Sequence, residues 1–314
     1  MGSESRRDFL RISAAMGGTA MLGPLLKAAA QDEKPLDMVV VRSEKTGPVT
    51  DNEGVDANAK IMTEKAIEAL GGMGRFVKKG DSVWIKPNMA WDRQPEQAAN
   101  TNPVVVATLV KLCLDAGAKK VRVGDNPCNE APKCYPHSGI EAAAKAAGAE
   151  VVYLDSNRFK DYDVGGKVLT QWPVYPDIVE SDLVINAPIV KHHSIAKATM
   201  CMKNYMGVVS GNRGLWHPDL ATCLCEITAF MKPRLCVLDA TRIMTAHGPT
   251  GGNLEDVQRK DMIAAGTDIV AIDAWGAELL GHQPQDIASV AAGAEAGLGQ
   301  MDYRKLAFRE LSVA

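Results

Sequence analysis

Residues 81–126 read DSVWIKPNMAWDRQPEQAANTNPVVVATLVKLCLDAGAKKVRVGDN and contain the pattern that decides the fold. The apolar run Val83–Ile85 predicts a buried strand that ends at Pro87, because proline has no N–H group for the hydrogen-bond ladder. Pro103 begins a helical apolar pattern, since proline is favoured in the first turn of a helix. Residues 121–123 then predict a second strand. This order predicts two parallel strands joined by a right-handed crossover.

The same alternation continues along the chain. The first helix after residue 100 has Thr101 or Asn102 as its cap, and Asp268 caps a later one. We expect an α/β fold with a mostly parallel sheet and helices on both faces. A split into two lobes around a cleft, with a boundary near residues 155–180, stays open as an alternative. Apolar patterns predict further strands at 38–41, 151–154, 183–185, 235–238 and 262–265, helices at 56–70, 140–147, 219–230, 269–280 and 284–295, and a two-residue hairpin turn within 163–168.

Composition excludes one class of partner. The chain has 314 residues, of which 46% are hydrophobic and 23% are charged, and its net charge is −3. These values are typical of a globular protein. The sequence has no long basic run and no aromatic–basic interleaving, so nucleic acid is not an expected partner.

The N-terminus has the pattern of an export signal. Ser5–Arg11 reads SRRDFLR, a Gly/Ala-rich apolar stretch follows, and Ala28–Ala30 offers a cleavage site. We expect residues 1–30 to be a signal for the twin-arginine translocation machinery, and residues 31–314 to be a single α/β domain that is periplasmic or otherwise exported. This apolar stretch is too short to span a membrane stably, and we expect no membrane span to remain once the signal has been removed. A basic amphipathic helix is the alternative.

Twin-arginine export and the cysteines bear on cofactors. The route carries folded proteins, which suits a chain that takes up a metal or an organic cofactor before export.

Cys128 and Cys134 flank a proline-rich loop and are candidates for a disulfide or, together with His193, for metal ligands. None of the seven cysteines forms a C-x-x-C pair, which disfavours an iron–sulfur cluster.

The densest reactive cluster lies in Asp182–Gly207, which reads DLVINAPIVKHHSIAKATMCMKNYMG. It brings two adjacent imidazoles close to Lys191, which we expect to hold negative charge. Neighbouring residues in an extended segment point in opposite directions, so we expect one imidazole, His193 rather than His192, to enter a cleft and transfer protons. Lys203 lies among sulfur and aromatic residues, which lowers the pKa of a lysine and suits it as a base, nucleophile or anion anchor.

Further polar side chains follow the predicted strands. Because ligands of parallel sheets bind beyond the carboxyl ends of the strands, we expect these side chains to share one site with the Lys191 cluster. Plain solvation at the surface is the alternative for each of them. The candidate ligand-binding residues are Lys86, Asn88, Asp92, Arg93, Asp125, Asn126, Lys191 and Asn204, with His217, Asp239, His247 and the loop 248–252 as weaker candidates.

The motifs together resemble the domain-of-unknown-function 362 family. They are Ile85–Asn88, the strand from Asp182 with Lys191-x-His193, Lys203-Asn204-x-x-Gly207, His247–Pro249 and Gly266–Asp273. The resemblance covers nearly all of the chain after the signal and implies no general activity. Many members carry an added ferredoxin-like cluster segment, and the absence of C-x-x-C here departs from that pattern.

The order of these residues is also remotely similar to the nickel-pincer lactate racemase. That resemblance implies a proton-transfer role for His193 and a covalently anchored organometallic cofactor on Lys203. The glycine-rich run that precedes the racemase lysine is replaced by Ala198–Met202. The resemblance is one of fold and site placement.

The sequence therefore predicts an exported, cofactor- or metal-assisted enzyme. Its substrate would be a small anionic, carboxylate-bearing molecule, and its reaction a proton or hydride transfer. Two alternatives remain open: a non-catalytic periplasmic protein that binds a metal or ligand, and an iron–sulfur-type redox protein.

Overall fold

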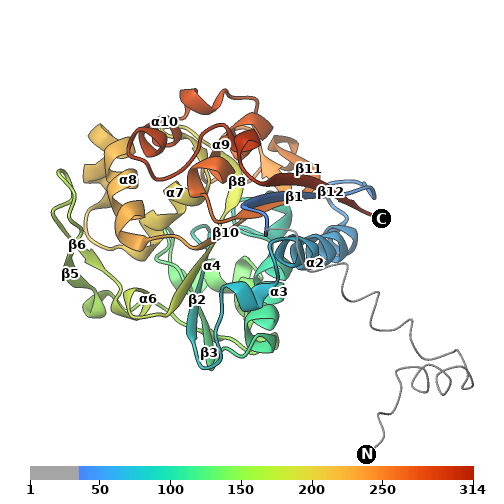
Figure 1. Ribbon diagram of the computed structural model, residues 1–314, viewed down its shortest axis with the longest axis horizontal. Helices are drawn as coiled ribbons and strands as arrows, with labels where there is room; N and C mark the ends of the chain where they lie inside the picture. Colours follow the sequence, from blue (N-terminus) through green and yellow to red (C-terminus); the bar gives the residue numbers. More distant parts are fainter. Residues whose placement is uncertain (1–34) are drawn as a thin grey trace, which may run out of the picture. The chain divides into compact units, whose positions relative to one another are not determined.

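The computed structural model describes residues 35–314, so the expected export signal lies outside the described residues. A ten-stranded sheet runs through the described part in the order β12-β1-β11-β10-β7-β2-β3-β4, with β8 paired to β10 and β9 paired to β8 (Figure 1). Its strands are β1 (Met38–Ser43), β2 (Ser82–Pro87), β3 (Lys120–Val123), β4 (Glu150–Val151), β7 (Leu183–Ala187), β8 (Ile189–His193), β9 (Lys197–Thr199), β10 (Leu235–Met244), β11 (Val257–Gly266) and β12 (Phe308–Val313).

Most of the strand pairs are parallel. Strands β4, β3, β2, β7 and β10 pair in parallel, as do β8 with β10 and β1 with β12. Strand β11 is antiparallel to both β1 and β10, and β9 is antiparallel to β8. The predicted α/β class with a mostly parallel sheet is confirmed.

Helices cover both faces of the sheet, as the burial of alternate strand residues requires. In β1, Val39 and Val41 belong to one apolar cluster, whereas Met38 and Val40 belong to the other. The first cluster includes α2 (Asn52–Ala69), α3 (Pro103–Asp115), α4 (Ala131–His137) and α5 (Ile140–Ala146). The second includes α6 (Pro176–Val179), α7 (Cys201–Asn204), α8 (Leu220–Met231), α9 (Ile269–Leu279) and α10 (Ala288–Glu295).

The predicted helix caps are confirmed. The Asn102 side chain accepts hydrogen bonds from Val104 N and Val105 N, and Pro103 occupies the first turn of α3. The Asp268 side chain accepts from Ala271 N at the start of α9. Both caps satisfy N–H groups that have no partner inside the helix.

Several elements differ from the sequence prediction. Helix α4 occupies a segment that looked like a loop, and β12, not residues 262–265, is the final strand. Strand β10 continues past Asp239 to Met244, with a register shift between Ala240 and Arg242. Strands β5 (Lys160–Asp163) and β6 (Gln171–Val174) form the expected hairpin, but its connection is longer than two residues. The Glu226 carboxylate holds this loop by accepting three of its N–H groups, those of Lys167, Val168 and Leu169.

Within the described residues, none of the helices has both the length and the apolar character needed to cross a membrane.

Candidate functional site

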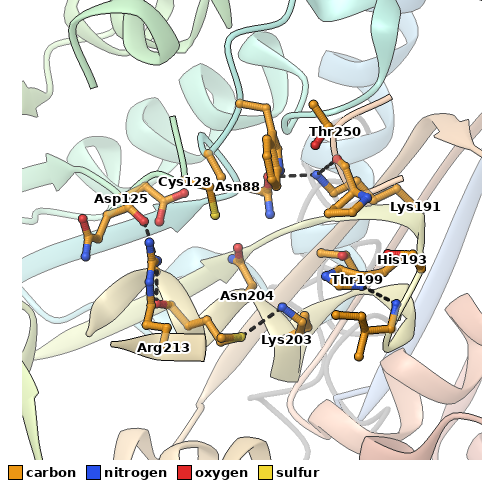
Figure 2. A pocket seen from close by; sticks show the side chains of 18 of the residues that line it. Asn88, Asp125, Cys128, Lys191, His193, Thr199, Lys203, Asn204, Arg213 and Thr250 are labelled. Atoms are coloured by element: carbon orange, nitrogen blue, oxygen red, sulfur yellow. Dashed lines mark hydrogen bonds between the residues drawn. The ribbon is translucent and has the colours of Figure 1, made fainter. Parts of the chain in front are cut away.

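A cavity of about 410 Å³ opens where β2, β3 and β7 end and the β8–β9 hairpin begins (Figure 2). The structure therefore brings the predicted strand-end groups and the Lys191 cluster around one space, as expected for a parallel sheet. Nine of the predicted residues line it: Lys86, Asn88, Asp125, Asn126, Cys128, Lys191, His193, Lys203 and Asn204.

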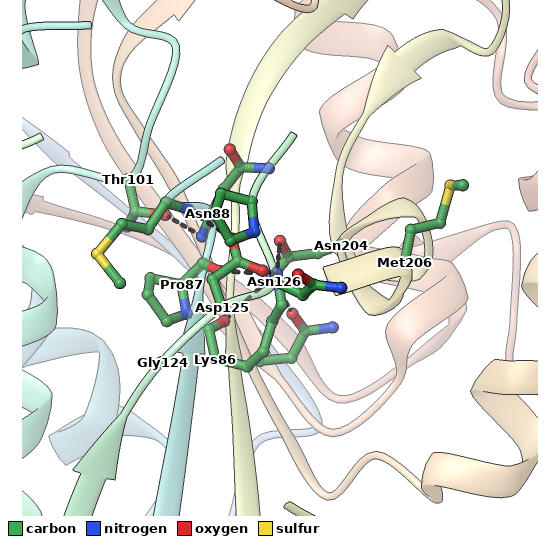
Figure 3. A network of polar contacts seen from close by, with 12 residues as sticks. Lys86, Pro87, Asn88, Thr101, Gly124, Asp125, Asn126, Asn204 and Met206 are labelled. Carbon is green, nitrogen blue, oxygen red and sulfur yellow. Dashed lines mark hydrogen bonds and ion pairs between the residues drawn. The ribbon is translucent and has the colours of Figure 1, made fainter. Parts of the chain in front are cut away.

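A closed ion pair forms one wall of the cavity. Lys86 Nζ lies 2.8 Å from Asp125 Oδ1, and both side chains are only 1% exposed (Figure 3). Lys86 Nζ also donates to Asn204 Oδ1 and to Pro87 O, and Asp125 Oδ2 accepts from Met89 N. Burial lowers the pKa of Lys86, and the Asp125 charge opposes this effect. The two opposite charges compensate each other, so the pair has little net charge with which to attract a charged ligand.

Gly207 is required for this ion pair. A Cβ atom at residue 207 would lie 1.9 Å from Asp125 Oδ1 and 2.6 Å from Lys86 Nζ. Since no side chain fits there, the glycine in the motif Lys203-Asn204-x-x-Gly207 allows the backbone to pack directly against the buried charges.

Buried polar groups hold the segment that carries Lys203. Asp273 accepts hydrogen bonds from Cys201 N at 2.7 Å and Met202 N at 2.9 Å. Asn186 donates to Cys201 O and accepts from Asn204 Nδ2. These contacts hold the short helix α7 in place from both sides. Asp273, the last residue of the motif Gly266–Asp273, therefore has a structural role.

The β8–β9 hairpin presents alternate residues to the cavity. Lys191 and His193 lie on one face of β8, and Thr199 of β9 is paired with Lys191 across the ladder. His192 does not line the cavity, and its Nδ1 accepts from Gly248 N at 3.1 Å. One of the two adjacent imidazoles thus reaches the cavity, as the alternation of side chains in a strand predicts.

Lys191 is fully buried and lacks a carboxylate partner among residues 35–314. Its Nζ donates to the backbone oxygens of Ala99 and Pro249, lies 3.4 Å from Asn88 Oδ1, and lies 5.5 Å from the centre of the Trp91 ring. Burial lowers the pKa of Lys191 to about 7. An anion in the cavity would restore a counter-charge and favour the ammonium form.

His193 is held as a neutral imidazole. Its Nδ1 accepts from Ile195 N at 3.1 Å and Ala196 N at 3.2 Å, so the ring proton is assigned to Nε2. Burial, with the charges of Lys203 and Lys191, lowers the pKa of His193 to about 3. The ring therefore offers an N–H donor at neutral pH.

Lys203 and Arg213 complete the cationic lining. Lys203 Nζ contacts Met206 Sδ at 2.9 Å, and burial lowers the pKa of Lys203 to about 8. The Arg213 guanidinium donates to the backbone oxygens of Asn126, Pro127 and Met206, which ties the loop after β3 to the segment after α7.

Four predicted site residues do not line the cavity: His192, Asp92, Arg93 and Cys134. Asp92 contacts His137 at the surface, and Arg93 donates to the backbone oxygens of Asp92 and Gly251. Cys134 is buried in α4, so the predicted set of Cys128, Cys134 and His193 is not assembled. Across residues 35–314, no three His, Cys, Asp or Glu side chains are grouped to hold a metal ion.

Sequence reasoning missed Thr199, Trp91 and Arg213. Thr199 lies in a short strand whose place opposite Lys191 depends on a hairpin that the sequence did not reveal. Arg213 comes from a 3₁₀ segment, Arg213–Asp219, that has no local motif. The nearest signal was the weaker candidate His217, which also lines the cavity.

The comparisons with known proteins support the family that the sequence motifs resemble. Residues 83–278 match the profile of the domain of unknown function DUF362. The chain belongs to this family. The chain is also similar to a thylakoid-associated protein of Synechocystis sp., to which it is 30% identical over 241 residues. The match covers 74% of this chain and 73% of that protein. The matched family segment contains every residue that lines the cavity.

A solved structure also matches part of the chain. It is the crystal structure of a Thermotoga maritima protein determined by structural genomics, with a TM-score of 0.41 and 12% sequence identity. The match covers 80% of this chain and 60% of that chain.

Proposed function

We propose that this protein is an enzyme that binds a small anionic, carboxylate-bearing molecule in the cavity. One observation carries the proposal: Lys191 and Lys203 line a space whose only lining carboxylate within the described residues, Asp125, is already paired with Lys86. Buried cations without a counter-charge are costly unless a ligand supplies one.

Size and donor groups support the same ligand class. A volume of about 410 Å³ is in the range of pockets that enclose small molecules. His193 offers Nε2–H, and Thr199 Oγ1 is buried without a hydrogen-bond partner among residues 35–314. Two neutral donors beside an uncompensated ammonium group suit the oxygens of a carboxylate.

The reaction class that we propose is proton transfer, with Lys203 as the group that exchanges the proton. A pKa of about 8 leaves part of this lysine as the free amine near neutral pH. His193 then acts as a donor that orients the ligand, because its Nδ1 is occupied by two backbone N–H groups.

Ligand binding tests the proposal directly. We expect calorimetry at pH 6.5 to detect binding of hydroxy-, oxo- and dicarboxylates and to detect no binding of the corresponding amides. Lys191→Met and Lys203→Met are each expected to weaken binding about tenfold or more, the effect of losing about 1.4 kcal/mol. The exposed helix residue Lys111 provides the matched control Lys111→Met, which should bind like the parent.

Two outcomes would contradict the proposed ligand class. One is binding of the amides as tightly as the acids. The other is unchanged affinity in both the Lys191→Met and the Lys203→Met variants.

We also propose that the protein is exported by the twin-arginine route. The motif Arg6-Arg7 with Phe9 and Leu10 supports this proposal. Cell fractionation should find the parent protein outside the cytoplasm and the Arg6→Lys, Arg7→Lys double variant inside it. Equal distribution of the two proteins would be evidence against the proposal.

A further inference from the structure

The three lysines of the cavity differ in what their amino groups contact. Lys86 Nζ is enclosed by Asp125, Asn204 and a backbone oxygen. Lys191 Nζ is enclosed by two backbone oxygens and Asn88. In both environments the amino nitrogen is surrounded by hydrogen-bond acceptors.

Lys203 has a different environment. Within the part of the chain that the structure describes, its Nζ has one polar contact, the thioether of Met206 at 2.9 Å, and a thioether is a weak acceptor. The neighbouring cations Arg213 and Lys86 disfavour a further positive charge on this amine. Burial and these charges lower the pKa of Lys203 to about 8, so its lone pair is available near neutral pH.

A second observation points to a ligand in the same cavity. Thr199 is 4% exposed, and its Oγ1 has no hydrogen-bond partner among residues 35–314. Thr199 lies opposite Lys191 in the β8–β9 ladder, and His193 is on the same face as Lys191. Figure 2 shows Thr199 and His193 together at one side of the cavity with Lys203 beside them. The Thr199 hydroxyl, the His193 N–H and the Lys191 amine therefore all line one cavity and are groups that can bind carboxylate oxygens.

We propose that Lys203 forms an imine with the carbonyl group of a small oxo acid whose carboxylate is held by Thr199, His193 and Lys191. The Lys203 nitrogen attacks the carbonyl carbon to give a carbinolamine. The nitrogen then loses its second hydrogen, the former carbonyl oxygen leaves as water, and a C=N bond remains, with no net oxidation or reduction. This inference rests on the anion site of the proposed function, narrows its ligand class to oxo acids, and gives the Lys203 amine the role of nucleophile in place of that of proton acceptor.

Reductive trapping tests the inference. The full chain is incubated with glyoxylate, pyruvate or 2-oxoglutarate at pH 8, treated with sodium borohydride, digested and mapped by mass spectrometry. We expect Lys203 to gain the mass of one oxo acid less one oxygen atom. Lys203→Arg keeps the positive charge but cannot form an imine, so its adduct should be lost. Lys111→Met should be modified as fully as the parent.

Calorimetry on the same proteins separates this inference from the proposed function. Binding of an oxo acid without any adduct at Lys203 would overturn the imine and leave the anion site standing. No binding of any of the three acids would overturn both. Equal modification of many lysines, unchanged in Lys203→Arg, would show only non-specific chemistry and would also overturn the imine.

Discussion

His193 shows how backbone contacts decide the chemistry of one side chain. The sequence indicates a proton-transfer residue, since an unperturbed imidazole titrates near neutral pH. The hairpin instead directs two N–H groups at Nδ1, and burial disfavours the imidazolium. We infer that His193 is a fixed hydrogen-bond donor and that the proton-transfer role falls on Lys203.

We predict that His193 keeps one neutral tautomer from pH 5 to pH 8. The folded pKa of about 3 lies below the ordinary histidine value of 6.5, so the ring remains neutral throughout this interval. Nitrogen-15 NMR of the imidazoles should assign the proton to Nε2 at every pH in the range, with the His193→Asn variant identifying the resonances. A His193 signal that titrates between pH 5 and pH 8 would contradict the assignment.

The residues that the sequence could predict are those with a strong local pattern. Strand alternation was enough to predict that one of the two adjacent imidazoles would enter the cavity, and Pro87 was enough to end β2 beside it. Arg213 and Thr199 had no such signal, because Thr199 depends on a β8–β9 hairpin that the sequence did not reveal and Arg213 depends on contacts with the loop after β3. Cys134 was misplaced, because the prolines of α4 favoured a loop.

At the scale of elements, the junction between β2, β3 and the turn after α7 depends on Gly207. We predict that Gly207→Ala destabilises the protein by about 3–5 kcal/mol, the usual result of breaking a buried ion pair. Its added Cβ would displace Lys86 or Asp125. Urea unfolding followed by circular dichroism measures the loss.

Gly74→Ala is the matched control for this prediction. A Cβ at residue 74 would meet no atom within 4 Å, and the φ angle of Gly74 is not in the positive range that favours glycine. The control should change the free energy of unfolding by less than about 1 kcal/mol. Equal losses in the two variants would mean that the close packing at Gly207 is not responsible.

Elements with local signals were predictable, and those that depend on distant partners were not. The capped helices α3 and α9 and the apolar strands β1, β2, β3 and β7 follow from caps and apolar runs. Strand β12 is half exposed at the edge of the sheet, which weakens its apolar pattern. Helix α4 places Pro132 in its first turn, where a proline lacks only an N–H that the helix does not use.

For the whole molecule, burial of Lys191 makes stability depend on pH. The folded pKa of about 7 lies below the unfolded value of 10.5, so the unfolded chain binds more protons between these values. The free energy of unfolding should therefore rise with pH over this interval, by about 2–4 kcal/mol from this residue. Urea titrations at pH 7 and pH 10 measure the change.

Variants isolate the contribution of Lys191. Lys191→Met should flatten the rise between pH 7 and pH 10, whereas Lys111→Met should leave it as in the parent. A bound carboxylate favours the ammonium form and should stabilise the parent more at pH 7 than at pH 10. Equal slopes in all three proteins would contradict the role assigned to burial.

The place of β1 between β11 and β12 sets a condition on when the chain can finish folding. Met38 is opposite Gly266 on one side and Phe308 on the other. The ribosome makes β1 first among the strands and its two neighbours last, so the sheet cannot close until translation has nearly ended. Such long-range pairing is slow compared with local contacts. A leader ahead of β1 would thus precede a strand that stays unpaired until synthesis is almost complete. A translocase that accepts only folded cargo could bind the chain productively only after β11 and β12 have paired with β1.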